Sequence, residues 1–189
     1  MTSDDFFAHH DLARAFDGVP LDLASIDGMH HFEYALRDFI TLEKASDPDT
    51  TFLIHDCLPH DEQHASRERT AHRWAGDVWR LIVLLRAWRP NLAVTVVDPA
   101  PSGLGIVRGL DPISSVLSDH YDEIVTEYRA MPCGDLDDGA MDEHLNRVAG
   151  TWPTVLALLS DKPFRAANVE RLKAERALMA LGPAIGRAA

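Results

Sequence analysis

The sequence predicts an α/β protein with about four strands, the last of them antiparallel, followed by a helical C-terminal tail. Two short apolar runs, residues 21–26 and 51–54, are typical of strands, and each ends abruptly in polar residues. A segment with helical spacing separates them. Strand, helix and strand in this order, with polar residues at both strand exits, favour an open parallel sheet with a site at the carboxyl ends of its strands.

Two helices are expected around the first strand. Residues 3–5 (Ser-Asp-Asp) can cap a short N-terminal helix, which residues 18–20 (Gly-Val-Pro) end. A second helix is predicted from residue 29 to about residue 44, because apolar residues recur there at three- and four-residue spacing: Phe32, Leu36, Phe39 and Ile40.

The middle of the chain predicts a loop, one long helix and a hairpin. The polar residues 59–67 are expected to form a loop over the strand ends. Residues 67–88 place apolar side chains on one helical face, and Pro90 ends that helix. Residues 92–97 and 103–107 are predicted as a third and a fourth strand joined as a hairpin.

A helical face is predicted again over residues 116–128, and an acidic, glycine-bearing segment then indicates a linker. Short helices are expected around residues 141–149, 152–160 and 168–181. We therefore predict an α/β domain over residues 1–130 and a helical C-terminal extension over residues 131–189.

Composition narrows the possible partners and the compartment. The formal net charge is -12, whereas a nucleic-acid surface needs a cationic footprint, so we expect neither nucleic acid nor a membrane as partner. The two cysteines fit a reducing compartment. The N-terminus is acidic where a signal peptide would be basic, and no apolar run approaches the length of a membrane span. We expect a cytoplasmic protein.

Five short stretches, taken in order, carry a resemblance to a known family. They are residues 23–31 (LASIDGMHH), 36–38 (LRD), 54–59 (IHDCLP), 76–79 (GDVW) and 96–105, which contains VVD and GLG. Together they resemble the C-terminal half of a class I S-adenosylmethionine-dependent methyltransferase, in the branch with an IDG-H strand end followed by an HDC-P strand end. The likeness covers about residues 2–110. It implies an incomplete Rossmann-like three-layer sandwich whose strands are the fourth to seventh of that fold, with the hairpin as its antiparallel edge.

The cofactor-binding half of that family has no counterpart in this sequence. Class I methyltransferases bind S-adenosylmethionine at a glycine-rich turn after their first strand, and no Gly-x-Gly-x-x-Gly occurs here. By resemblance, Ser3 and Asp4 correspond to the residues on the adenine side of the cofactor. We therefore expect either a truncated methyltransferase or a half-domain that works differently. An open reading frame upstream of Met1 that encodes a strand and a Gly-x-Gly turn would restore the ordinary enzyme.

The resemblance also implies a metal site and a base. Asp27 and Asp56 follow neighbouring parallel strands, so their carboxylates can converge on one divalent cation such as Mg²⁺. In metal-dependent methyltransferases of sugars and catechols, a histidine three positions after the first aspartate can act as base, and His30 has that position. It would take the proton from a substrate hydroxyl during methyl transfer. His55 stands where related enzymes can have a carboxylate, which shifts the preference toward a metal that accepts imidazole.

Each of these residues also has a structural interpretation. Asp27 can cap the following helix, His30 can be a surface histidine in its first turn, and Asp56 can hold the next loop. Cys57 is expected to be a half-buried, unreactive residue. Trp74 is expected in the core, whereas Trp79 with Asp77 is expected to line the cleft.

Two functions of different classes follow. The first is a methyltransferase that acts on a small-molecule hydroxyl. The second is a non-catalytic half-domain that assembles through its sheet. Because the strand at residues 21–26 lacks its usual neighbour, its apolar edge needs a cover. We expect either a homodimer joined through that edge or coverage of it by the C-terminal helices.

Overall fold

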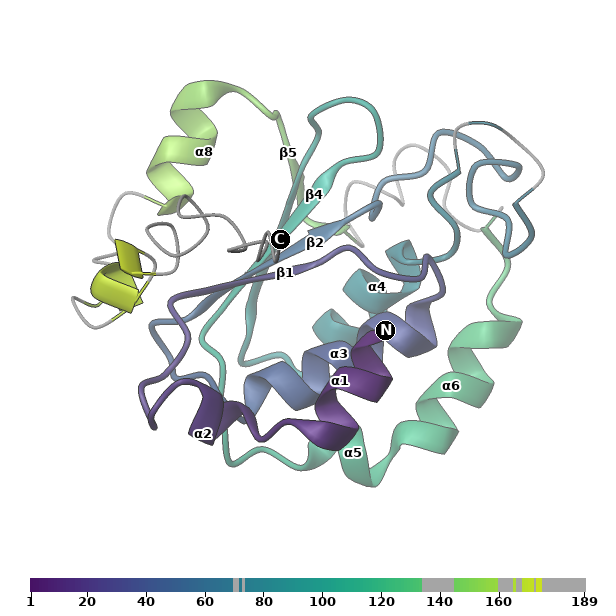
Figure 1. The fold of residues 1–189 in the computed structure, drawn as a ribbon. Coiled ribbons are helices and arrows are strands. Elements are labelled where there is room, and N and C mark those ends of the chain that lie inside the picture. Colours follow the sequence, from purple (N-terminus) through teal and green to yellow (C-terminus); the bar gives the residue numbers. More distant parts are fainter. Residues whose placement is uncertain are drawn as a thin grey trace, which may run out of the picture.

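The computed structural model describes residues 1–69, 72, 74–133, 145–159, 165, 168–171 and 173–174. Figure 1 shows the chain as helices and strands around one central sheet. The elements in chain order are α1 (Ser3–His9), α2 (Leu12–Ala15), β1 (Leu23–Ile26), α3 (Phe32–Glu43), β2 (Thr51–His55), α4 (Trp79–Trp88), β3 (Ala93–Val97), β4 (Leu104–Arg108), α5 (Val116–Asp119), α6 (Tyr121–Ala130), β5 (Arg147–Val148) and α8 (Trp152–Leu159). The predicted α/β class is confirmed.

The described sheet has five strands in the order β1-β2-β4-β3-β5. β1 and β2 are parallel, with Ile26 opposite Ile54, so the two predicted strands do end side by side. β4 lies between β2 and β3 and is antiparallel to both, which confirms the predicted hairpin. The sheet is thus an incomplete Rossmann-like sheet that contains both parallel and antiparallel strand pairs.

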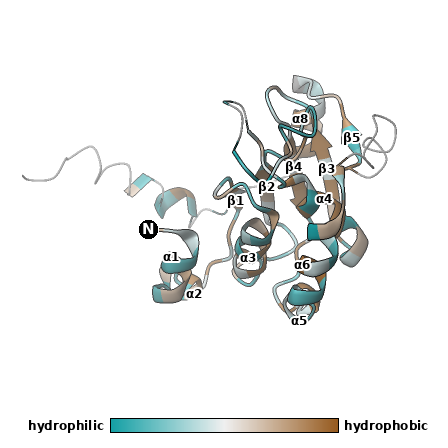
Figure 2. Ribbon diagram, turned by 90° about the vertical axis from the view of Figure 1, so that its right-hand side faces the viewer, coloured by the Kyte–Doolittle hydropathy of each residue, from teal (hydrophilic) through white to brown (hydrophobic). Residues whose placement is uncertain are grey.

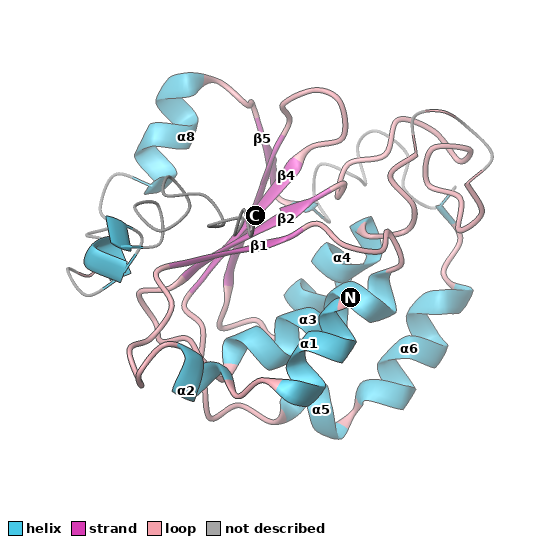
Figure 3. Cartoon of the chain, viewed as in Figure 1, coloured by secondary structure: helices cyan, strands magenta, loops and turns pink. Residues whose placement is uncertain are grey.

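Helices lie on both faces of this sheet. Figures 1 and 3 show α3, α4 and α6 on one face and α8 on the other. Figure 2 shows α1 and α2 beside α3, at the β1 end of the sheet, with their polar and apolar residues mixed along the ribbon.

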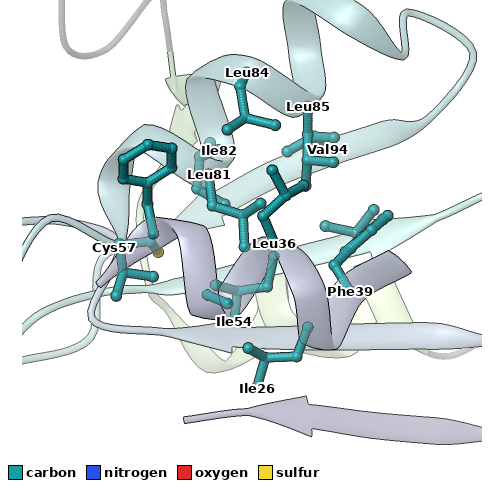
Figure 4. Packing of buried hydrophobic residues seen from close by; sticks show 14 of the residues in the cluster. Ile26, Leu36, Phe39, Ile54, Cys57, Leu81, Ile82, Leu84, Leu85 and Val94 are labelled. Atoms are coloured by element: carbon teal, nitrogen blue, oxygen red, sulfur yellow. The ribbon is translucent and has the colours of Figure 1, made fainter. Parts of the chain in front are cut away.

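The core lies between the sheet and the α3–α4 layer (Figure 4). Leu36 and Phe39 of α3 and Leu81 of α4 are fully buried, as is Ile54 of β2. Burial of one such side chain stabilises the fold by about 1.5–3 kcal/mol. This shared core fixes the two helices against β2, and with it the loops that leave β1 and β2.

The predicted long helix over residues 67–88 is wrong in its first half. α4 begins only at Trp79, and Gly76 has a φ of +64°, a left-handed conformation that an α-helix cannot contain. Upstream of Gly76, the side chain of Arg67 pairs with Glu33 and Asp77. Tertiary contacts therefore override the apolar periodicity of this segment.

Two other helical segments are divided. The N-terminal helix is two helices, and the cap of the first is Thr2, whose hydroxyl accepts from the backbone N–H of Asp5, rather than residues 3–5. The helical face over residues 116–128 is split at His120, which ends α5 and precedes α6.

The C-terminal region contains a strand that the helical prediction did not include. Within the expected helix at 141–149, Arg147 and Val148 form β5 and pair in parallel with Val96 and Val97. α8 confirms the helix expected from residue 152. Of residues 168–181, the described ones, 168–171 and 173–174, are helical. The predicted linker after residue 133 lies outside the described residues. In the described part of the chain, no helix is both long and apolar enough to cross a bilayer.

β1 is the outer strand of the described sheet, as the sequence predicted. A C-terminal segment lies against the residues that lead into it. The Arg165 guanidinium donates to the Leu21 carbonyl at 2.9 Å and to Asp22 at 2.7 Å, and the Asn168 amide donates to the Pro20 carbonyl at 3.0 Å. These contacts attach the tail beside β1.

Candidate metal and base site

The candidate site lies at the carboxyl ends of β1 and β2, where four chemically competent side chains meet. Asp27 directly follows β1. His55 is the last residue of β2, and Asp56 follows it. One ligand atom from each of Asp27, His30 and Asp56 lies within 4.8 Å of the others, and these three form the one such group found among the described residues. The four residues Asp27, His30, His55 and Asp56 are here called the DHHD cluster.

Asp56 is the buried centre of the DHHD cluster. Its side chain is 8% exposed, and its Oδ2 lies 3.0 Å from Nε2 of His30 and 3.1 Å from Nδ1 of His55. Its φ of +58° is left-handed, a conformation that aspartate tolerates better than most residues. This backbone turn brings the carboxylate between the two imidazoles instead of continuing β2.

Asp27 forms the open side of the cluster. Its side chain is 52% exposed, and its Oδ1 lies 3.5 Å from Nδ1 of His55 and 3.7 Å from Nε2 of His30. A small molecule or ion would therefore reach the cluster from the Asp27 side.

The cap interpretation of Asp27 is wrong. α3 begins at Phe32, its N-terminal neighbour His31 makes no side-chain cap, and the Phe32 N–H donates instead to Asp77 at 2.9 Å. His30 likewise precedes α3 and faces the cluster, so it is not a surface histidine in the first turn of a helix.

His30 has a defined orientation. Its Nδ1 lies 3.0 Å from the Trp74 carbonyl oxygen. A carbonyl only accepts hydrogen bonds, so Nδ1 carries the hydrogen, and Nε2 is the nitrogen that faces Asp27 and Asp56. A ligating histidine typically donates its other N–H in this way.

The donor set fits a divalent cation. Two carboxylates supply the negative charge, and two imidazole nitrogens face the same point. Nδ1 of His55 is buried and makes no hydrogen bond, although it lies close to both carboxylates. Oxygen donors alone favour Mg²⁺, whereas added imidazoles suit transition metals such as Mn²⁺ or Zn²⁺.

Ser3 and Asp4, which were expected on the adenine side of a cofactor, contact α3 instead of the cluster. Asp4 pairs with Arg37 at 3.0 Å. Burial raises the pKa of Asp38, although a hydrogen bond with the Ser3 side chain opposes the shift. Ser3 also lines an apolar groove of about 480 Å³ that runs along β1 between Phe6, Phe7 and Ala24.

The predicted roles of the tryptophans are reversed. Trp79 and Asp77 are fully buried and do not line a cleft. Trp74 is only half-buried, and its ring stacks on His30 with centroids 5.1 Å apart. Cys57 is fully buried instead of half-buried, and burial raises the pKa of its thiol to about 12, which agrees with the unreactive role expected for it.

Sequence reasoning missed the residues that support His30. Trp74 and Asp77 form hydrogen bonds with His30, and Asp77 also accepts one from Phe32. Gly76 lies close to the His30 backbone, and each of these contacts spans more than forty residues of chain. The one local signal was Gly76, because a glycine inside a helical pattern can mark its interruption.

Comparison of the chain with protein-family models, with curated proteins and with solved structures finds no match. The resemblance to methyltransferases therefore stays a prediction.

Proposed function

We propose that this chain is a methyltransferase-type domain that binds a divalent cation at the DHHD cluster and acts on a hydroxyl of a small molecule. The observation that supports this most directly is the meeting of Asp27, His30, His55 and Asp56 at the ends of two adjacent parallel strands. Ligand sites in open α/β sheets lie outside these strand ends.

In this proposal, Asp27, His55 and Asp56 hold the cation. A bound cation would act as a Lewis acid on the acceptor hydroxyl and lower the cost of its deprotonation. Asp56 is fixed by burial, while the exposed Asp27 leaves an open side for the substrate.

His30 acts as the base. Since Nδ1 already donates to Trp74, the only ring position that can take a proton is Nε2, which faces the cluster. A base at this place accepts the hydroxyl proton while the methyl group of S-adenosylmethionine is transferred.

The cofactor needs a second surface. The groove beside β1 could accept the adenine, because it is mainly apolar and Ser3 lies in its wall. The proposal requires that a glycine-rich turn come from outside the present sequence, either from the same protein or from another chain.

Calorimetric titration with S-adenosylmethionine tests this function, together with release of S-adenosylhomocysteine in the presence of catechol and sugar acceptors. We expect turnover to fall about 100-fold or more in His30→Gln. The exposed His120→Gln is the matched control and should retain activity. The absence of any heat at millimolar S-adenosylmethionine would rule out cofactor binding by this chain alone, and equal turnover in both variants would contradict the proposal.

A second candidate, a non-catalytic half-domain that assembles through β1, is favoured by one observation. β1 pairs on one side only within the described sheet, and Leu23 is 45% exposed. Exposed apolar edges promote pairing between chains.

Sedimentation of the purified protein tests this assembly. A homodimer is expected, and Leu23→Lys should dissociate it, because charge on an edge strand opposes pairing. Ile113→Lys changes another exposed apolar residue, in the segment between β4 and α5, and should leave the dimer intact. A monomeric wild-type protein would rule this candidate out.

A further inference from the structure

The segment from Trp74 to Asp77 makes four separate contacts with His30 and with Phe32, the first residue of α3. The Trp74 carbonyl accepts from Nδ1 of His30 at 3.0 Å, and the Trp74 ring stacks on the imidazole at an interplanar angle of 22°. The Asp77 N–H donates to the His30 carbonyl at 3.1 Å, and its carboxylate accepts from the Phe32 N–H. Both the imidazole ring and the backbone carbonyl of His30 are therefore held.

Gly76 allows this close approach. A Cβ at this position would lie 1.8 Å from the His30 carbonyl oxygen and 2.7 Å from its Cβ, so no other residue fits without movement of the loop. The φ of +64° adds a second requirement for glycine.

The segment is itself anchored. The Trp74 indole N–H donates to the Ser66 carbonyl at 2.5 Å, and the Ala75 N–H donates to the His64 carbonyl at 3.1 Å. Asp77 is fully buried and pairs with Arg67 and with Arg80, the latter at 2.8 Å. This network ties the segment to the start of α4, which is part of the core.

We infer that residues 74–77 are a positioning segment for His30: they hold Nδ1 as the protonated nitrogen and direct Nε2 at Asp27 and Asp56. Which ring nitrogen of a histidine is free follows from the hydrogen bond that the other one makes. Only the role of Nε2 as the base rests on the proposed function. The orientation itself does not depend on cofactor, cation or substrate.

The test is the tautomer of His30, read from the ring ¹⁵N shifts of histidine-labelled protein without any ligand. The His30 signals are identified by their loss in His30→Gln. In the wild type we expect a protonated Nδ1 and an unprotonated Nε2 when the ring is neutral. Gly76→Ala should convert His30 to a mixture of tautomers. Gly18→Ala introduces the same left-handed strain where nothing lies within 4 Å, and should leave His30 unchanged.

If Gly76→Ala does not fold, a second pair of variants tests whether residues 74–77 position His30. Trp74→Ala removes the stacked ring and its anchor to Ser66 and should give mixed tautomers, whereas Trp74→Phe keeps a stacked ring and should restore most of the wild-type signal. A purely structural role would lower the melting temperature without changing the tautomer. A protonated Nε2 in the wild type, or an unchanged tautomer in folded Trp74→Ala, would overturn the inference. Failure of methyl transfer alone would leave it standing.

Discussion

Ile26 of β1 lies directly opposite Ile54 of β2 in a parallel ladder. The next residues along the two strands are Asp27 and His55, and the left-handed turn at Asp56 then brings a second carboxylate back to the same place. One pairing in the sheet therefore assembles a site from residues almost thirty positions apart.

Ile54→Ala tests whether this pairing depends on the core beneath it. Ile54 is fully buried, so we expect a loss of about 2–5 kcal/mol in the free energy of unfolding, measured by urea denaturation. Ile113→Ala shortens the same side chain where it is 90% exposed and should change stability by less than about 0.5 kcal/mol. Equal losses in the two variants would show that Ile54 is not a core residue.

Acid stability should depend on Glu33. Burial works to raise the pKa of Glu33, but hydrogen bonds and charge from Arg67 and charge from Arg129 outweigh it, so the pKa is lowered. The stabilisation is therefore complete above the ordinary glutamate range, about pH 4.3, and is lost as pH falls through the lowered pKa.

Urea denaturation of Glu33→Gln against pH measures this contribution. At neutral pH the variant should lose about 1.5–3 kcal/mol, since hydrogen bonds to charged groups are of that size. Toward acid pH the difference from the wild type should shrink. The exposed Glu123→Gln is the control and should follow the wild type throughout. A difference that grows toward acid pH would contradict the account.

The two cysteines should differ in reactivity. Burial raises the pKa of both thiols, that of Cys57 to about 12, but Cys57 is fully buried whereas Cys133 is only partly buried. A thiol reagent near neutral pH should therefore modify Cys133 first, and Cys57 only after unfolding. Mass spectrometry of the modified peptides measures this order. Rapid labelling of Cys57 in the native protein would show that the β2–α4 region is open.

Local patterns predicted the elements that hold the site. The apolar runs of β1 and β2 and the four- and three-residue spacing of Phe32, Leu36 and Phe39 are determined within each segment, so strand, helix and strand were predictable. The convergence of Asp27 and Asp56 followed because parallel strands end at a common edge.

Long-range contacts escaped the same reasoning. The periodicity of residues 67–88 predicted one helix, but Gly76 and the pairing of Arg67 with Glu33 hold the first half in another conformation. The support of His30 by Trp74 and the addition of β5 beside β3 likewise join distant segments. Neither of these contacts produces a periodic pattern in the sequence.

Titration with Mn²⁺, followed by calorimetry, tests the central claim most directly. The wild type should bind Mn²⁺ at one site and more tightly than Mg²⁺, because the imidazole of His55 joins the two carboxylates. Asp56→Asn should weaken that binding by about tenfold or more, whereas Asp98→Asn, which changes the aspartate after β3, should bind as the wild type does. Absence of Mn²⁺ binding by the wild type, or unchanged affinity in Asp56→Asn, would contradict a cation site at the ends of β1 and β2.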